Sequence, residues 1–175
     1  MNQKHIITGA PGTGKTSIIN ELENRGFHCI HEKSREIISE QMIKGGNILP
    51  WKNQIAFENK IANIRLKQYI SSSKKSICFF DRSPIDCIAY LRLNNLQATS
   101  EIIQNIKQCN FNMNVFYTPI WEEIYINEDE RKENIEQAKE IEEHIIYTYQ
   151  SQGYRLIKIP KKPVFDRVDF ILSQI

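Results

Sequence analysis

The chain has 175 residues, a formal net charge of +2, 41% hydrophobic residues and 25% charged residues. This length and composition predict one soluble globular domain over residues 1–175, with a core of its own. The small net charge argues against nucleic acid or an anionic membrane as a partner, and no apolar run approaches the roughly 20 residues that span a bilayer. The first residues lead directly into a polar-flanked strand, so no signal peptide is expected.

The four cysteines are widely scattered and include no C-x-x-C pair; they are Cys29, Cys78, Cys87 and Cys109. This spacing argues against a disulfide or zinc framework. The predicted compartment is therefore the cytoplasm.

Short apolar runs alternate with segments of helical periodicity along the whole chain. Strands are predicted around residues 6–7 and over 27–31, 76–81, 114–117 and 154–159. Helices are predicted over 17–23, 34–44, 53–71, 85–93, 101–107, 129–149 and 164–172. This alternation predicts an α/β fold with a parallel sheet and helices on both faces, so that ligands gather at the carboxyl ends of the strands.

The first strand runs into Gly-Ala-Pro-Gly-Thr-Gly-Lys-Thr, which has the P-loop pattern G-x-x-x-x-G-K-T. Glycines let the backbone bring its N–H groups close to phosphate oxygens, and the next helix points its positive end at the same anion. Lys15 is expected to reach the β- and γ-phosphates of ATP or GTP, and Thr16 to hold Mg²⁺. An ordinary glycine-rich turn is the alternative, but the strand before and the helix after supply the context that the motif requires. The predicted nucleotide contacts are Gly9, Ala10, Pro11, Gly12, Thr13, Gly14, Lys15, Thr16 and Ser17.

Glu32 closes the second predicted strand, so it would face the same crevice in a doubly wound sheet. A carboxylate there can accept the proton of a substrate hydroxyl, and Arg35 follows on the same side of the next helix. The alternatives are a helix N-terminal charge for Glu32 and a solvated pair for Arg35 and Glu36. Glu32 is thus a candidate catalytic and substrate-binding residue, and Arg35 a candidate substrate-binding residue.

Asp81 ends the third predicted strand, and the segment continues through Arg82 and Ser83 to Asp86. A carboxylate at this place is what a P-loop protein needs to hold Mg²⁺. Arg82 would neutralise the charge of the transferred phosphoryl group, and with Asp86 it is a candidate substrate-binding residue. The alternatives are that Asp81 only caps the next helix and that Arg82 forms a surface ion pair.

Arg131 lies in a charged segment within a possible lid at about 119–133. Closure of such a lid would bring an arginine to the transition state and exclude water. The alternative is a solvent-exposed, charged start of the long helix.

Arg167 begins the last predicted helix, and the loop 159–163 before it is placed to flank a nucleobase. We therefore predict that Arg167 contacts the nucleotide.

In these motifs the chain resembles the small single-domain predicted ATPases grouped with the AAA superfamily, whose structural kin are nucleoside and nucleotide kinases. The resemblance covers nearly the whole chain and includes the segments 9–16, 32–38, 80–86 and 129–131, with Gly153-Tyr154, Pro160 and Arg167. It implies a three-layer P-loop kinase-like fold with a five-stranded sheet ordered 2-3-1-4-5. The triplet Asp81-Arg82-Ser83 also looks like the strand-three motif of deoxynucleoside kinases, in which a catalytic glutamate follows strand two; Glu32 matches that place.

Two functions follow from these observations. The first is a Mg²⁺-dependent kinase that passes the γ-phosphoryl group of ATP or GTP to a small-molecule acceptor, which is a nucleoside, a nucleotide or a cofactor-like molecule. The second is a nucleotide-hydrolysing switch or binding module that signals to a protein partner and has no such acceptor.

Overall fold

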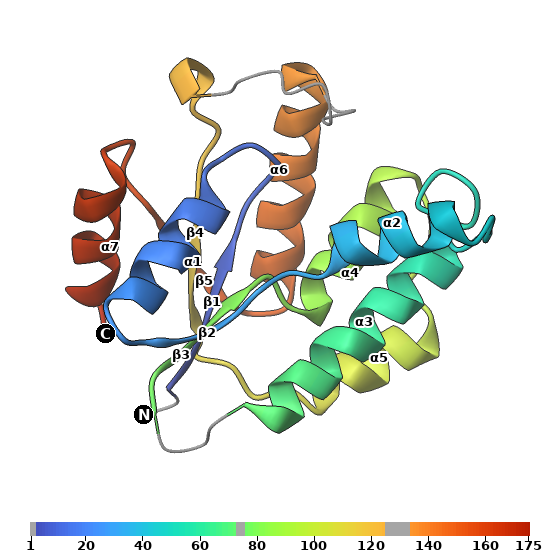
Figure 1. Cartoon of the computed structure of the whole chain (residues 1–175), viewed down its shortest axis with the longest axis horizontal. Helices are drawn as coiled ribbons and strands as arrows, with labels where there is room; N and C mark the ends of the chain where they lie inside the picture. Colours follow the sequence, from blue (N-terminus) through green and yellow to red (C-terminus); the bar gives the residue numbers. More distant parts are fainter. Residues whose placement is uncertain (1–2, 73–75, 125–133) are drawn as a thin grey trace.

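The computed structural model describes residues 3–72, 76–124 and 134–175, and in these residues five parallel strands form one sheet (Figure 1). The strands are β1 (Lys4–Thr8), β2 (His28–Ile30), β3 (Cys78–Asp81), β4 (Asn114–Tyr117) and β5 (Arg155–Lys158). Their order is β2-β3-β1-β4-β5. The expected α/β class and strand order are therefore both confirmed.

Helices follow most strands, as the alternating pattern predicts. They are α1 (Lys15–Asn24), α2 (Ser34–Ile43), α3 (Gln54–Ser71), α4 (Pro84–Leu93), α5 (Ser100–Lys107), α6 (Ile135–Ser151) and α7 (Val164–Leu172), with a short 3₁₀ turn at Glu122–Ile124. The predicted helix over 129–149 begins later than expected, because the Asn134 side chain caps it by accepting from the Gln137 N–H at 2.9 Å. Residues 129–133 of that prediction lie outside the described residues.

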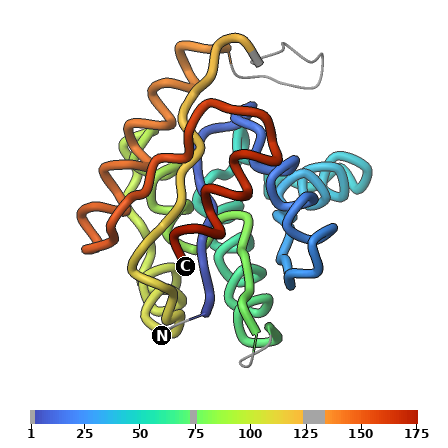
Figure 2. Tube along the Cα trace, turned by 90° about the vertical axis from the view of Figure 1, so that its left-hand side faces the viewer, coloured from blue at the N-terminus to red at the C-terminus, as the bar shows by residue number. Residues whose placement is uncertain are grey.

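Both faces of the sheet are buried, and this explains the nearly continuous apolar runs of its strands. Neighbouring residues of one strand face opposite layers. Ile7 and Phe79 pack with residues of α1 and α7, whereas Ile6 and Phe80 pack with residues of α4 and α6. In Figure 2, α6 accordingly lies on one side of the sheet and α1 on the other.

A further apolar cluster joins α2, α3, α4 and α5 beside the sheet. The periodicity of the helix predicted over 53–71 places Ile55 on an apolar side with Ile61, Ala62, Ile64 and Tyr69, but Ile55 is 40% exposed. The buried side of α3 instead carries two charged residues, Glu58 and Arg65, beside Ile61 and Ala62. Their burial is possible because Arg65 meets Glu32, Ser83 and Cys87, and Glu58 meets Cys87 and the charge of Arg65.

No helix in the described parts of the chain is long and apolar enough to cross a membrane.

Candidate active site

Gly9 leads from β1 into the P-loop, and its backbone φ of 144° lies in the region that favours glycine. A Cβ atom added to it would lie only 2.6 Å from the carbonyl oxygen of Thr118, at the end of β4. Gly14, with a φ of 81°, occupies the N-cap of α1 and offers no side chain to cap it. The N–H groups of the first turn of α1 are therefore left without a side-chain acceptor, as in anion sites at helix N-termini.

The P-loop is braced from two distant parts of the chain. The Thr13 hydroxyl donates to the Ala10 carbonyl at 2.9 Å and lies 2.6 Å from the Thr118 hydroxyl. From α7, the Arg167 guanidinium donates to the Thr13 carbonyl at 2.9 Å. Arg167 is 4% exposed, and its Nε has no hydrogen-bond partner among the described residues. These contacts hold the loop's backbone in one conformation, which lowers the entropic cost of binding a ligand.

Lys15 is buried within this loop and donates from Nζ to the Ala10 carbonyl at 2.7 Å. Burial, together with the positive charge of Arg82, lowers the pKa of Lys15 to about 7. The carboxylates of Asp81 and Glu32 oppose this shift, so both lie within electrostatic reach of the ammonium group. Phosphate oxygens near Lys15 would favour its charged form in the same way.

Asp81 ends β3 directly beside the root of the P-loop, because the register pairs it with Ile7 of β1. It is 7% exposed, and its Oδ1 has no hydrogen-bond partner among the described residues. Burial raises its pKa, while the Lys15 ammonium works in the opposite direction. A buried carboxylate oxygen without a partner is costly unless a cation or donor meets it, and this fits a metal-ligating role.

The alternative that Asp81 caps α4 is wrong, because other residues form that cap. Ser83 Oγ accepts from the Ile85 N–H at 3.1 Å, and Asp86 Oδ2 accepts from the Ser83 N–H at 2.8 Å. Asp86 is fully buried and also accepts from the hydroxyls of Thr8, at 2.5 Å, and Tyr149, at 2.6 Å. With both its oxygens engaged, Asp86 holds the turn in place, and its predicted contact with a substrate stays a prediction.

Arg82 has a φ of 72°, the left-handed region that non-glycine residues rarely adopt. Such strain persists only where the surroundings impose it, and it is found preferentially at functional sites. The alternative of a surface ion pair is wrong: Arg82 is 4% exposed and lies 3.3 Å from oxygens of both Glu32 and Asp86. Its guanidinium also lies over the Tyr90 ring, with the carbon 5.4 Å from the ring centroid.

Glu32 receives three contacts, and all of them go to one oxygen. Its Oε1 accepts from Ser34 Oγ at 2.7 Å and from Arg65 at 2.9 Å, and it lies 3.3 Å from Arg82 Nε. Burial alone would raise the pKa of Glu32, but the guanidiniums of Arg82 and Arg65 outweigh it and lower the pKa to about 2. The side chain is 27% exposed. Glu32 is therefore an ionised carboxylate with one face open to solvent.

Two charged residues around Glu32, Arg65 and Glu58, were not predicted from the sequence. Arg65 donates to Glu32, to the Ser83 carbonyl at 3.0 Å and to the Cys87 sulfur at 3.3 Å. Glu58, 4% exposed, is also part of the cluster: burial raises its pKa to about 7, although the charge of Arg65 and a hydrogen bond with Cys87 oppose the shift. One signal in the sequence could have found both. Positions 58, 61, 62 and 65 share one helical face, and Glu58 and Arg65 stand there beside the apolar Ile61 and Ala62.

Of the other residues predicted for the site, some are exposed at the surface and one lies outside the described residues. Thr16 and Ser17, in the first turn of α1, are exposed, and so is Arg35, in the first turn of α2. Arg131 lies outside the described residues, together with much of the predicted lid at 119–133. The first part of that segment is anchored, since the Ile120 N–H donates to Glu142 of α6 at 2.7 Å.

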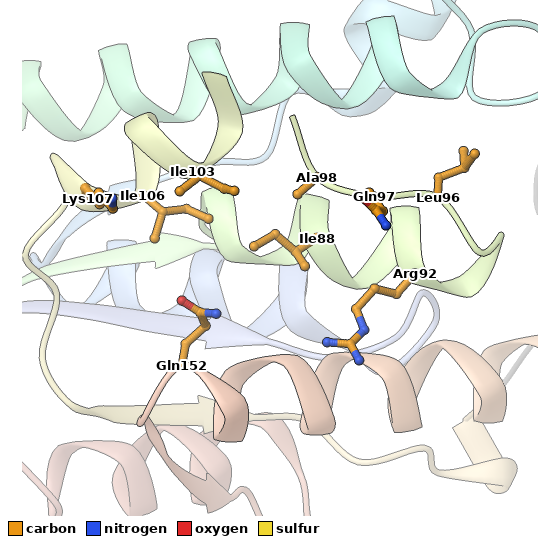
Figure 3. Close-up of a pocket in the computed structure, with 9 residues that line it drawn as sticks. All are labelled: Ile88, Arg92, Leu96, Gln97, Ala98, Ile103, Ile106, Lys107 and Gln152. Carbon is orange, nitrogen blue, oxygen red and sulfur yellow. The ribbon is translucent and has the colours of Figure 1, made fainter. Parts of the chain in front are cut away.

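A separate cavity of about 510 Å³ lies between α4, α5 and the end of α6 (Figure 3). Apolar side chains such as Ile88, Ile103 and Ile106 line it together with Arg92, whose guanidinium lies over the Tyr147 ring. None of the predicted site residues lines this cavity, so we do not assign it to the phosphate chemistry.

Comparison with known proteins agrees with this fold. A family model described as an AAA domain matches residues 4–167. The chain belongs to this AAA-domain family. No curated protein sequence matches the chain.

Solved structures of deoxyadenosine kinase and of NadR are among those that resemble this AAA-domain chain in fold. One is deoxyadenosine kinase from M. mycoides with dCMP and dCDP bound, at 17% identity and a TM-score of 0.70, with 98% of this chain and 97% of that chain covered. The other is NadR in complex with NR, at 14% identity and a TM-score of 0.73. That match covers 97% of this chain but 50% of NadR. The fold is thus that of P-loop kinases, and the function has to be argued from the site.

Proposed function

We propose that the protein is a Mg²⁺-dependent kinase that transfers the γ-phosphoryl group of ATP or GTP to a hydroxyl of a small molecule. The acceptor is a nucleoside, a nucleotide or a cofactor-like molecule. The observation that carries this proposal is the state of Glu32: an ionised carboxylate, fixed through one oxygen and partly exposed, within electrostatic reach of Lys15 in the P-loop. A protein that only binds a nucleotide has no need of such a group.

The P-loop residues 9–17 would hold the triphosphate through backbone N–H groups and the positive end of α1. Lys15 would leave the Ala10 carbonyl for the β- and γ-phosphates, and Arg82 would neutralise charge on the transferred group. Arg167 keeps the loop in shape through Thr13 and would contact the nucleotide from α7. Arg131 stays a prediction, as the cation of a lid that closes over the reacting groups.

The residues present fit Mg²⁺. This ion is usually held by one or two protein groups together with phosphate oxygens, and it does not need a dedicated cage. Accordingly, the described residues contain no group of three or more His, Cys, Asp or Glu side chains that could hold a metal. The partnerless Oδ1 of Asp81 and the exposed Thr16 hydroxyl are the groups that would hold the ion. When bound, Mg²⁺ neutralises charge on the β- and γ-phosphate oxygens.

On the acceptor side, the low pKa of Glu32 defines its role. A carboxylate with a pKa of about 2 is a weak base, so it orients the attacking hydroxyl by accepting its hydrogen bond and takes the proton only as transfer proceeds. Phosphoryl transfer requires positioning and charge neutralisation more than early deprotonation. The bound molecules named for the similar structures, NR in NadR and dCMP in deoxyadenosine kinase, support a nucleoside-like acceptor.

The test is transfer of label from radiolabelled ATP or GTP in the presence of Mg²⁺ and a panel of nucleosides, nucleotides and cofactor precursors. We expect a labelled phosphorylated acceptor from the wild type and at least a hundredfold less from Asp81→Asn. Exposed Asp166→Asn, on α7, is the matched control and retains wild-type turnover. Label that appears only as free phosphate with every acceptor contradicts the kinase and favours the hydrolysing switch.

A further inference from the structure

Arg65 contacts Glu32, the Ser83 carbonyl and the Cys87 sulfur, and it comes from a helix that carries none of the predicted site residues. It lies on α3 and is 7% exposed. One terminal nitrogen donates to Glu32 Oε1 at 2.9 Å, and the other donates to the Ser83 carbonyl at 3.0 Å and lies 3.3 Å from the Cys87 sulfur. A single planar group thus joins the end of β2 to the turn that follows Asp81.

A buried arginine is not explained by stability alone. Removing two charges from water costs several kcal/mol per ion, and apolar residues of similar volume often serve stability as well or better. The rigid fork of a guanidinium, however, fixes the direction of the groups it binds, which a point charge does not. The geometry of Arg65 therefore fits a residue that orients a neighbouring side chain.

The side chain that Arg65 orients is Glu32. The contacts described for this carboxylate, from Ser34, Arg65 and Arg82, all end on Oε1, and none of them uses Oε2. With Oε1 held from α2, α3 and the β3–α4 turn, the carboxylate cannot rotate freely. Because Glu32 is 27% exposed, the other oxygen is the one left for a ligand.

We infer that Arg65 is a positioning residue: it locks Glu32 against the turn after Asp81 so that Oε2 is presented to the acceptor hydroxyl. This role rests on the proposed kinase function, but the locked carboxylate itself does not. The groups that lower the pKa of Glu32 are Arg82 from the β3–α4 turn, Arg65 from α3 and Lys15 from α1, with the Ser34 hydroxyl from α2. Two carboxylates also face Glu32, Asp81 from β3 and Glu58 from α3, and their like charge opposes that effect.

The first part of the test needs no acceptor. Selective ¹³C labelling of glutamate carboxyl groups, with Glu32→Gln to assign the signal, follows protonation of Glu32 from pH 7 down to the lowest pH at which the protein stays folded. In Arg65→Met we expect the midpoint to rise by at least one pH unit. Exposed Arg25→Met, which removes contacts to Glu21, Phe165 and Asp169 and none to Glu32, leaves the midpoint unchanged.

The second part uses the acceptor found in the labelling experiment. Arg65→Met should lower kcat at least tenfold while the Kd for Mg-ATP changes less than twofold, because a misplaced reacting group slows transfer without touching the P-loop. Arg65→Lys, which keeps the charge but loses the fork, should recover less than half of kcat. A merely structural arginine would lower stability and ATP affinity together.

The possible outcomes are distinct. An unchanged Glu32 midpoint and an unchanged kcat in Arg65→Met overturn the inference. If Arg65→Met does not fold, Arg65→Lys decides, and wild-type kcat in that variant overturns it equally. If the wild type phosphorylates no acceptor, the proposed function fails, whereas the carboxylate titration still supports or refutes the lock on Glu32.

Discussion

Arg167 and Thr13 are 154 residues apart in the sequence, yet the guanidinium of the first donates to the carbonyl of the second at 2.9 Å. A helix near the end of the chain thereby supports the loop near its start. The bond uses one terminal nitrogen, and the buried Nε has no hydrogen-bond partner among the described residues. Arg167 therefore braces the P-loop, and its contact with the nucleotide stays a prediction.

Arg167→Met should weaken Mg-ATP binding, because the Thr13 carbonyl loses its donor and the loop loses its brace. Hydrogen bonds from charged groups contribute about 1.5–3 kcal/mol, and part of this should appear as a roughly tenfold higher Kd in calorimetry. Arg155→Met, a change at an exposed residue of β5, serves as the control. Equal affinity in all three proteins would show that α7 plays no part in nucleotide binding.

Lys15→Ala should reduce Mg-ATP affinity roughly 10- to 100-fold, since it removes a charge-assisted contact to phosphate. The fold should survive, because burial already disfavours the charged amine and the lost bond to Ala10 is a single one. Calorimetry gives the Kd, and thermal unfolding gives the stability. Lys44→Ala, an exposed residue paired with Glu40, is the control, and an unchanged Kd for Lys15→Ala refutes the phosphate site.

Glu58 should make stability depend on pH. Its pKa is raised from 4.5 to about 7 by burial, although Arg65 opposes the shift, so the folded state binds a proton that the unfolded state releases. The stabilising effect is thus complete below about pH 4.5 and is lost as pH rises through about 7, on the order of 3 kcal/mol in total. Urea unfolding at pH 5 and pH 8 measures this change.

Glu58→Gln should remove most of that pH dependence, because the amide cannot ionise. Glu143→Gln, a change of the same kind at an exposed position of α6, should behave as the wild type does. If Glu58→Gln lost as much stability between pH 5 and pH 8 as the wild type, Glu58 would not be the group that titrates.

The parts of the candidate site that could be predicted from the sequence are those whose residues are close together in the chain. The P-loop is contained in eight consecutive residues flanked by a strand and a helix, and Asp81 follows directly from an apolar strand. The same reasoning failed for α3, where Ile55 is exposed and Arg65 is buried. Burial there depends on the packing of α3 against α4 and on Glu32, which follows β2, and helical periodicity alone does not contain these contacts.

The contact of Gly9 with Thr118 was likewise beyond the residue pattern. It arises because β4 lies beside β1 in the sheet, with Thr8 paired to Tyr117. Strand order came from the family resemblance and not from spacing, so the residues that close on the P-loop from β4 had no local signal. Long-range pairing is the part of the fold that a single sequence specifies least directly.

The pair Asp86 and Tyr149 offers the cleanest test of the scaffold under the site. Tyr149 is fully buried, donates to Asp86 at 2.6 Å and lies 2.8 Å from Ser83 Oγ. Tyr149→Phe leaves a buried carboxylate with one donor fewer, so the free energy of unfolding should fall by about 1–3 kcal/mol. Tyr147→Phe, two residues earlier in α6 and 55% exposed, should change stability by less than about 0.5 kcal/mol. Equal effects of the two changes in urea unfolding would mean that Asp86 does not depend on the Tyr149 hydroxyl.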